Sequence, residues 1–293
     1  MDQAGILRDR LASLHKDKYV SNAPAARVIT VASGKGGVGK TNSCVNLALY
    51  LHKKGMRVVV LDADLGLANI EILMGFSPKH SLLDVLAGKN TLDEIITYGH
   101  GGLGFISGGS GLVEMANIND QMLAATVDKL SALDEIADIV LIDTGAGISN
   151  VVMKFVTAAS ECIVVCTPEP TSITDSYSLI KAVRDRGEHE AIPRIKMIIN
   201  GAEDRDEGRN IFNNLHKVCQ KFLGMELEHL GTLPHDQNLR KAVRMQKPCI
   251  LSFPNTAFSK EIESIGSKLL DLKVEPEKKG MRGFMKRLSN MFK

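Results

Sequence analysis

The chain has 293 residues, of which 44% are hydrophobic and 24% charged, as in folded globular proteins. Its formal net charge is only +2, so no overall field favours nucleic acid, and no specific nucleic-acid ligand is expected. No apolar run reaches the roughly 18–20 residues that a membrane-spanning helix needs. The first residues lack a secretory apolar core, so we expect a cytoplasmic protein whose five cysteines stay reduced.

Short β-rich runs alternate with helix-length amphipathic segments along most of the chain. The predicted strands are 27–33, 57–64, 103–108, 138–144, 161–167, 194–200 and 225–233, and the helices include 41–53, 119–132, 171–186, 207–222 and 257–271. Most strands are continuous Val/Ile/Leu stretches, which indicates burial on both faces by crossover helices. The pattern predicts an α/β fold with a doubly wound, mainly parallel sheet of about seven to eight strands and helices on both faces.

A phosphate-binding motif lies between the first strand and the first helix, in "SGKGGVGKTN" at 33–42. Gly34, Gly39, Lys40 and Thr41 match the Walker A spacing of a P-loop NTPase. Backbone N–H groups of the loop and of the helix N-terminus would surround the phosphates. The predicted nucleotide-binding residues here are Gly34, Lys35, Gly36, Gly37, Val38, Gly39, Lys40, Thr41 and Asn42. Lys40 would neutralise phosphate charge, and Thr41 would ligate Mg²⁺.

Two apolar strands end in carboxylates that suit the same site. Asp62 and Asp64 lie in "LDADLGLANIEILMG" (61–75), and Asp143 lies in "IVLIDTGAG" (139–147). A carboxylate at the end of a buried strand needs a cation or strong hydrogen-bond donors, so Asp143 is expected to contact Mg²⁺ through water. The alternative is that these acids are ordinary strand-end residues.

A second lysine, Lys35, stands five residues before Lys40, and "KGGVGKT" resembles the deviant Walker A motif of the MinD/ParA family of ATPases. The resemblance implies that Lys35 crosses a dimer interface to the partner's phosphates, giving an ATP-dependent homodimer. It also implies slow Mg²⁺-dependent ATP hydrolysis, with Lys35, Lys40 and Asp64 as catalytic residues and Thr41, Asp62 and Asp143 at the metal. Otherwise Lys35 is a solvated loop lysine.

The same resemblance assigns the adenine pocket. Asn200 ends the strand 194–200, and Pro234, His235 and Asp236 follow the last strand. In the family an asparagine and a proline-containing loop at these places hold adenine, and the sequence has no guanine-specific NKxD motif. ATP or ADP with Mg²⁺ are therefore the expected cofactors. Glu169 and Asp175, in "CTPEPTSITDSY", are weaker candidates for the dimer face.

The last residues form a hydrophilic linker (273–280) and a basic tail (281–293). Apolar residues recur at helical spacing along the tail, at Met281, Phe284, Met285, Leu288, Met291 and Phe292. An apolar stripe among basic residues predicts a helix that binds an anionic membrane surface, reversibly for one tail and firmly for two. The alternative is a helix that docks on the core.

The N-terminal "DQAGILR" resembles the DQAxxLR motif of the FlhG-type (YlxH/FleN) flagellar-number regulators of the same family, at Asp2, Gln3, Ala4, Leu7 and Arg8. It implies that residues 1–20 stimulate an SRP-type GTPase, FlhF, and flagellar C-ring proteins are further expected partners. The domains would be 1–20 (activator helix), 21–272 (P-loop ATPase), 273–280 (linker) and 281–293 (membrane-targeting helix). The protein would reach the inner face of the cell membrane when ATP-bound.

Three other classes use a similar ATPase core. A MinD-type division-site regulator lacks the N-terminal motif, and a ParA-type partition ATPase needs a basic DNA-binding patch on the folded domain. An iron–sulfur carrier needs paired cysteines at a dimer axis, whereas Cys162 and Cys166 lie inside a predicted strand.

Overall fold

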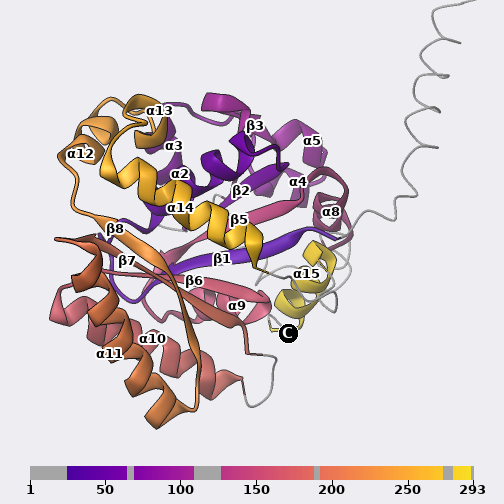
Figure 1. The fold of residues 1–293 in the computed structure, drawn as a ribbon. Helices are drawn as coiled ribbons and strands as arrows, with labels where there is room; N and C mark the ends of the chain where they lie inside the picture. Colours follow the sequence, from indigo (N-terminus) through magenta and orange to yellow (C-terminus); the bar gives the residue numbers. More distant parts are fainter. Residues whose placement is uncertain (1–24, 65–68, 109–126, 188–191, 273–279, 292–293) are drawn as a thin grey trace, which may run out of the picture.

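The computed structural model describes residues 25–64, 69–108, 127–187, 192–272 and 280–291. These residues form an eight-stranded sheet with the strand order β3-β4-β2-β5-β1-β6-β7-β8 (Figure 1). The strands are β1 (Arg27–Ser33), β2 (Val58–Ala63), β3 (Thr97–Tyr98), β4 (Gly104–Ser107), β5 (Ile139–Ala146), β6 (Glu161–Cys166), β7 (Arg194–Ala202) and β8 (Leu227–Pro234). Every neighbouring pair is parallel except β3–β4, so the predicted fold class is confirmed.

Helices connect the strands and cover both faces of the sheet. They are α2 (Lys40–Lys53), α3 (Asn69–Met74), α4 (Leu82–Leu86), α5 (Leu92–Ile95), the 3₁₀ turn η1 (His100–Gly102), α8 (Leu133–Ile136), α9 (Asn150–Ala158), α10 (Pro170–Arg186), α11 (Arg205–Leu223), α12 (Gln237–Arg244), α13 (Cys249–Ser252), α14 (Ala257–Asp271) and α15 (Gly280–Asn290). The sequence predicted the long helices. It missed α9 and the helices of four to eight residues, because segments of that length do not show a clear helical period. No helix within the described ranges combines the length and apolarity needed to cross a bilayer.

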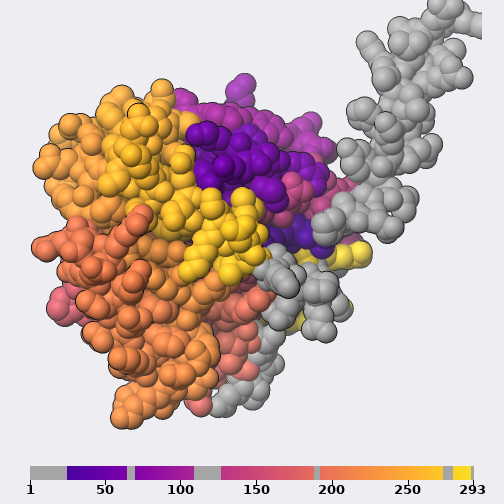
Figure 2. All heavy atoms as spheres, in the orientation of Figure 1, coloured from indigo at the N-terminus to yellow at the C-terminus, as the bar shows by residue number. Residues whose placement is uncertain are grey.

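The core lies on both faces of the sheet, as the continuous apolar strands predicted. α2 and α14 cover one face, and Figure 2 shows them side by side, in indigo and yellow-orange. On the opposite face, α10 and α11 cover β6 and β7, and a neighbouring cluster fills the space between β1, β2, β5, α9 and α15.

The C-terminal helix differs from its prediction. The sequence predicted a separate tail with an apolar stripe free to contact lipid, whereas α15 packs into the core beside α8 and α9 (Figure 1). The four stripe residues of the helix itself are 0–1% exposed: Met281, Phe284, Met285 and Leu288. Met291 is partly buried against the same cluster, and Phe292 lies outside the described residues. The prediction of an exposed stripe is therefore wrong for this structure, because helical spacing shows an apolar face but not what covers it.

A buried charge network closes the edge of the sheet where β1, β6 and β7 begin. The Arg27 guanidinium donates two hydrogen bonds of 2.8 Å to the Glu161 carboxylate. Lys196 Nζ lies 3.2 Å from Glu161 Oε2 and donates to Glu228 Oε2 at 2.8 Å. Burial raises the pKa of Glu161, but Arg27 and Lys196 outweigh burial and hold that pKa below its ordinary value.

Candidate functional site

The phosphate loop leaves the carboxyl end of β1 and ends where α2 begins at Lys40. Gly39 caps the helix with φ of 85°, a left-handed conformation that favours glycine, and a Cβ here would lie 2.3 Å from Asn200 Nδ2. At Gly34 a Cβ would lie 2.3 Å from the backbone of Asp175 on α10. Both positions therefore require glycine, because neighbouring atoms leave no room for a Cβ. The first turn of α2 has no acidic residue that would repel a bound anion.

Lys40 and Thr41 both point at Asp143, which lies near the end of the buried part of β5. Lys40 Nζ donates to Asp143 Oδ1 at 2.8 Å, and the Thr41 hydroxyl donates to Oδ2 at 2.7 Å. Lys40 is 7% exposed and Asp143 is fully buried. Burial raises the pKa of Asp143, and the hydrogen bonds from Lys40 and Thr41 oppose that rise. Lys40 is thus paired with Asp143 in this structure. When a metal–nucleotide complex binds, the metal would interact with Asp143 and the phosphates with Lys40.

Asp62 and Asp64 lie at the end of the neighbouring strand, β2. Asp62 is 4% exposed and accepts a 3.0 Å hydrogen bond from the backbone N–H of Asp64. Burial, reinforced by the charge of Asp143, raises the pKa of Asp62 to about 7. Asp64 instead lines the open cleft with Lys40 and Thr41. A cation near Asp62 and Asp143 would relieve the cost of burying their charges.

The oxygen donors at this point fit Mg²⁺. Thr41, Asp62 and Asp143 supply hydroxyl and carboxylate oxygens, which hard divalent cations prefer. Within the described ranges, no three His, Cys, Asp or Glu side chains form a metal-binding group of their own. Because Mg²⁺ commonly binds through one or two side chains together with substrate phosphates, the ion would be held jointly with a nucleotide.

The cleft continues from the phosphate loop to the ends of β6, β7 and β8, as a hollow of about 640 Å³. The predicted adenine residues Asn200, Pro234, His235 and Asp236 all line it, together with Asn42. Two of these side chains already have structural partners. Asn200 Nδ2 donates to the Val38 carbonyl at 2.8 Å, and Asp236 Oδ1 accepts from the backbone N–H of Asn238, which caps α12.

Two further residues of this cleft were missed by sequence reasoning. The hydroxyl of Thr167, just beyond β6, is buried without a hydrogen-bond partner and belongs to the cleft lining. Arg240 on α12 lines it as well. An unpaired buried hydroxyl in a ligand-sized cleft indicates a missing polar partner. The only available signal was the position of Thr167 at a strand end, and the strand order that places β6 beside β1 is not visible in the sequence.

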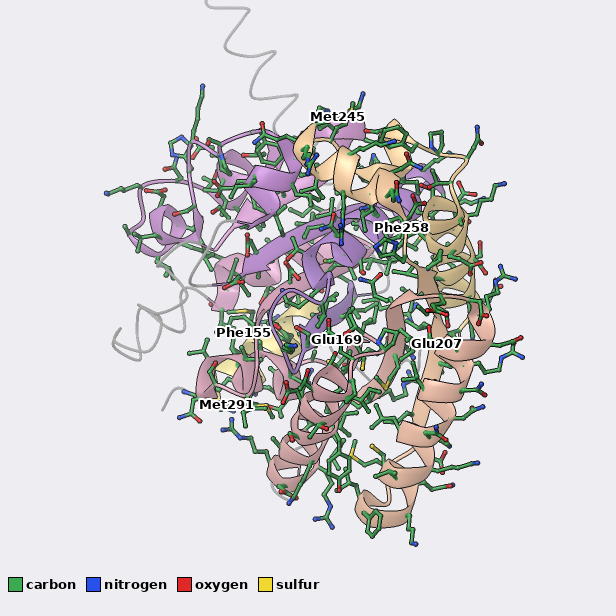
Figure 3. The ribbon with its side chains drawn as sticks, turned by 90° about the vertical axis from the view of Figure 1, so that its left-hand side faces the viewer. Phe155, Glu169, Glu207, Met245, Phe258 and Met291 are labelled. Atoms are coloured by element: carbon green, nitrogen blue, oxygen red, sulfur yellow. The ribbon has the colours of Figure 1, made fainter. Side chains whose placement is uncertain are left out.

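Lys35 lies on the open side of the loop and is bound within its own chain. Its Nζ donates to Glu169 Oε2 at 2.8 Å and to the Thr171 hydroxyl at 3.0 Å, and Figure 3 shows Glu169 beside the phosphate loop. The hydrogen bond that Lys35 donates to the Glu169 carboxylate raises the pKa of Lys35. The side chain is about 41% exposed, so it stays accessible from outside the chain.

Large apolar side chains are exposed around the same nucleotide cleft. They are Ile72 (56% exposed), Ile148 (54%), Val243 (36%) and Met245 (58%). Ile72 and Val243 line the part of the cleft next to Lys40, and Met245 follows α12 (Figure 3). Exposed apolar side chains around a ligand site are typical of a surface that another protein covers.

Two further sets of residues were discussed from the sequence: the N-terminal motif, and the two cysteines that were not expected to form a metal site. Asp2, Gln3, Ala4, Leu7 and Arg8 lie outside the described residues. Cys162 and Cys166 are fully buried inside β6, and burial raises the pKa of Cys162 to about 12. A thiol in that state is a poor metal ligand, because the thiolate is the binding form.

A phosphate loop at the carboxyl edge of a parallel sheet, with strand-end carboxylates facing its lysine, defines a P-loop NTPase. A family model described as "ParA: NUBPL iron-transfer P-loop NTPase" matches residues 25–270, so the chain belongs to the ParA/MinD family of P-loop NTPases. Members of this family are ATPases, and this chain is an ATPase of that kind.

Two curated proteins and one solved structure show how far the similarity extends. The antiactivator FleN of Pseudomonas aeruginosa is 40% identical over 253 residues, covering 86% of this chain and 89% of FleN. The flagellum site-determining protein YlxH of Helicobacter pylori is 35% identical over 287 residues, 96% of both chains. The septum site-determining protein MinD of Pyrococcus horikoshii, complexed with Mg-ADP, has the same fold, with a TM-score of 0.66 and 22% identity. The match covers 84% of this chain and 96% of the MinD chain.

Proposed function

We propose that this chain is an ATP-dependent dimerising switch that regulates the number and placement of flagella. Support comes from the flagellum site-determining protein YlxH and from the antiactivator FleN, which align with 96% and 86% of this chain. A MinD-type role in division or a ParA-type role on DNA is less well supported, since those relatives are more distant in sequence.

The nucleotide site suits ATP hydrolysis without a covalent intermediate. A bound Mg²⁺ would neutralise phosphate charge and would be held by Thr41, with Asp62 and Asp143 supporting its water ligands. Asp64 lines the same cleft as Lys40, and in this proposal it would orient the attacking water. Lys40 and the loop N–H groups would stabilise developing negative charge. Hydrolysis would be slow until a second chain contributes its own lysine.

One observation carries the dimer proposal: Lys35 is an accessible phosphate-loop lysine held only by contacts at the surface. Its ion pair with Glu169 joins side chains that are 41% and 64% exposed, so water screens the attraction between them. A phosphate of the nucleotide bound to a second copy of the chain would be a stronger, doubly charged partner for Lys35. The exposed apolar side chains beside the cleft would be buried in the same contact.

The membrane proposal requires α15 to leave its place in the core. Arg282 and Lys286 are exposed on the docked helix, so they can meet an anionic surface before any apolar side chain is released. Insertion of the stripe then replaces protein contacts with lipid contacts, and the net gain for one helix is small. Two helices on one dimer gain avidity of roughly 10²–10⁴-fold, which couples ATP binding to residence at the inner membrane face.

The N-terminal segment is the proposed contact for the SRP-type GTPase FlhF, with Gln3 as its expected functional side chain. The relative YlxH aligns over 96% of this chain, so little of either terminus falls outside the similarity. Flagellar C-ring proteins are proposed as further partners of the ATP-bound dimer.

Vesicle sedimentation tests the switch. The wild-type chain should pellet with vesicles containing phosphatidylglycerol when Mg²⁺ and a non-hydrolysable ATP analogue are present, and remain in the supernatant with ADP. Equal sedimentation in both states would contradict an ATP-controlled membrane switch. Nucleotide-dependent binding to plain duplex DNA, with none to vesicles, would favour the partition-ATPase alternative instead.

A second test addresses FlhF alone. A peptide of residues 1–20 should increase GTP turnover by the GTPase, and the same peptide with Gln3→Ala should not. Unchanged turnover with the native peptide would remove the FlhF role and leave the ATPase assignment intact.

A further inference from the structure

We propose that Glu169 changes its ion-pair partner when two copies of the chain meet. In this structure Glu169 pairs with Lys35, and after the exchange it pairs with Arg240 and Arg244 on the other side of the base pocket. The new pair closes the pocket over the bound base and slows the release of nucleotide. The proposal rests on the function above, in which Lys35 leaves its own chain for a phosphate bound to the second copy.

The contact between Lys35 and Glu169 is the starting state of this exchange. Lys35 Nζ donates to Glu169 Oε2 at 2.8 Å and to the Thr171 hydroxyl at 3.0 Å. The charge of Asp175 also acts on Lys35, but Asp175 is not part of the lining of the cleft. Glu169 does belong to that lining, so its carboxylate lies at the mouth of the nucleotide site.

Glu169 and the two arginines approach one hollow from different sides. Both sides line the hollow of about 640 Å³ that leads away from the phosphate loop. Glu169 follows β6, α12 follows β8, and the strand order places the end of β7 between them, at Asn200 and Gly201. Arg240 and Arg244 are four residues apart on α12, so their side chains share one face of that helix.

The arginines of α12 have no counter-charge of their own. Both are exposed, and neither side chain has an ion pair or hydrogen bond within the part of the chain that the structure describes. Asp236 precedes α12, but its carboxylate accepts from the backbone N–H groups of Asn238 and Phe258. From 237 to 260 the sequence has no acidic residue. A carboxylate across the hollow is therefore a suitable partner, because arginine binds carboxylates through paired hydrogen bonds.

Departure of Lys35 supplies the driving force for the exchange. Without Lys35 the Glu169 carboxylate lies beside an anionic nucleotide and is repelled by it. Pairing with Arg240 and Arg244 removes that repulsion. Contact between two copies also excludes water from the mouth of the cleft, which strengthens an ion pair there. The guanidinium groups then lie over the base, where they also interact favourably with its aromatic face.

Dissociation of ADP from the single chain tests the exchange without any dimer. Lys35→Ala frees Glu169 in the monomer, so ADP release should slow by about fivefold, as expected for one partly exposed ion pair. A chase of radiolabelled ADP with excess unlabelled ADP, in the presence of Mg²⁺, measures the rate for the full-length chain. The direction is diagnostic, because losing a lysine that bound the phosphates of its own chain would speed release.

Removal of the proposed new pair identifies its members. In the Glu169→Gln background, Lys35→Ala should change the rate of ADP release by less than about twofold. The same result is expected in a background that combines Arg240→Ala with Arg244→Ala. Comparing Lys35→Ala with its own background in each case cancels any direct contact of these side chains with ADP.

Two matched controls keep the charge changes but leave the pair intact. Asp175→Asn removes an acid that acts on Lys35 without lining the hollow. Lys241→Ala combined with Lys247→Ala removes two positive charges from the same exposed segment, again outside the lining. In both control backgrounds Lys35→Ala should still slow ADP release by about fivefold.

Unchanged or faster ADP release in Lys35→Ala would overturn the exchange. Slowing that persists in Glu169→Gln, or without both arginines, would overturn it as well. Light scattering decides the dimer separately. A wild-type chain that stays single with Mg²⁺ and a non-hydrolysable ATP analogue would overturn the dimer as the trigger, whereas slower ADP release in monomeric Lys35→Ala would still support the change of partner by Glu169.

Discussion

Buried carboxylates lie at both edges of the central sheet, but their pKa values are shifted in opposite directions. At the edge where β1, β6 and β7 begin, Arg27 and Lys196 hold the pKa of Glu161 low, so its buried charge is fully compensated. At the edge where β2 and β5 end, the pKa values of Asp62 and Asp143 are both raised, although Lys40 lies beside them. At the first edge the charge of Glu161 is compensated within the chain, whereas at the second edge a bound cation would compensate Asp62 and Asp143.

The direction of the pKa shift separates buried acids that stabilise the fold from buried acids that lie at the nucleotide site. Buried carboxylates occur at both edges, so burial alone does not identify the functional site. What distinguishes the nucleotide edge is a charge that its neighbours do not fully compensate: the pKa of Asp62 is raised, and exposed apolar side chains lie around the cleft. Perturbed acids beside a cleft are typical of functional sites.

The largest effect on stability is expected for Glu161→Gln. Removing one partner of a buried ion pair leaves Arg27 and Lys196 poorly compensated and should lower the free energy of unfolding by ~3–5 kcal/mol. Chemical denaturation measures the loss, and nucleotide affinity should stay within about twofold. The control is Glu228→Gln, whose carboxylate is 34% exposed, with an expected cost below ~1 kcal/mol.

The pH dependence of this network follows from the lowered pKa of Glu161. Its stabilisation is fully present above the ordinary glutamate pKa and is lost as pH falls through the lower pKa of the folded state. Denaturation midpoints of wild type and Glu161→Gln should therefore converge in acid. A constant difference between them at all pH values would show that the charge of Glu161 is not the source of stability.

Lys40→Ala should have the largest effect on binding at the other edge. Loss of charge-assisted hydrogen bonds to phosphate should weaken ATP affinity by roughly 100-fold, measured by calorimetry. The change also leaves Asp143 buried without its cation, so stability should fall as well. Lys40→Ala combined with Asp143→Asn should recover much of that stability but not the affinity. Normal affinity in Lys40→Ala would contradict the site.

Thr167→Ala should produce a smaller effect on the same cleft. If the unpaired hydroxyl bonds the nucleotide, its loss should weaken ADP binding by about fivefold, or ~1 kcal/mol, with no loss of stability. Ser176→Ala is a matched control, because the Ser176 hydroxyl is also buried but contacts the Cys166 thiol and does not line the cleft. Equal effects of the two substitutions on ADP affinity would remove Thr167 from the site.

The smallest expected signal is a proton released on binding. With a pKa of about 7, Asp62 is largely protonated at pH 6, and a nearby Mg²⁺–nucleotide complex would lower that pKa. Binding at pH 6 should therefore release close to one proton, and binding at pH 8.5 almost none from this group. Calorimetry in buffers of different ionisation enthalpy measures the release, which Asp62→Asn should abolish. Release that is independent of pH would exclude Asp62 as its source.

Local patterns predicted the nucleotide edge well and the α15 region poorly. The phosphate loop, its strand and its helix are encoded within a few residues of one another, which identified Lys40 and Thr41. Asp143 lies 103 residues from Lys40, but its place at the end of an apolar strand identified it on its own. The position of α15 depends on Phe155 and Asp134, more than a hundred residues away. Its basic composition suggested lipid, whereas its stripe equally fits a protein groove. The role of Lys35 at a dimer interface stays a prediction, and its contact with Glu169 depends on the packing of α10.

The central claim is that ATP joins two copies of this chain through Lys35. Light scattering with Mg²⁺ and a non-hydrolysable ATP analogue measures the mass directly. Wild type should have twice the chain mass of 31.8 kDa with the analogue and the single mass with ADP. Lys35→Ala should keep the single mass in both, while still binding the nucleotide. A wild-type chain that stays at 31.8 kDa with bound analogue, or a Lys35→Ala variant that doubles normally, would contradict the account.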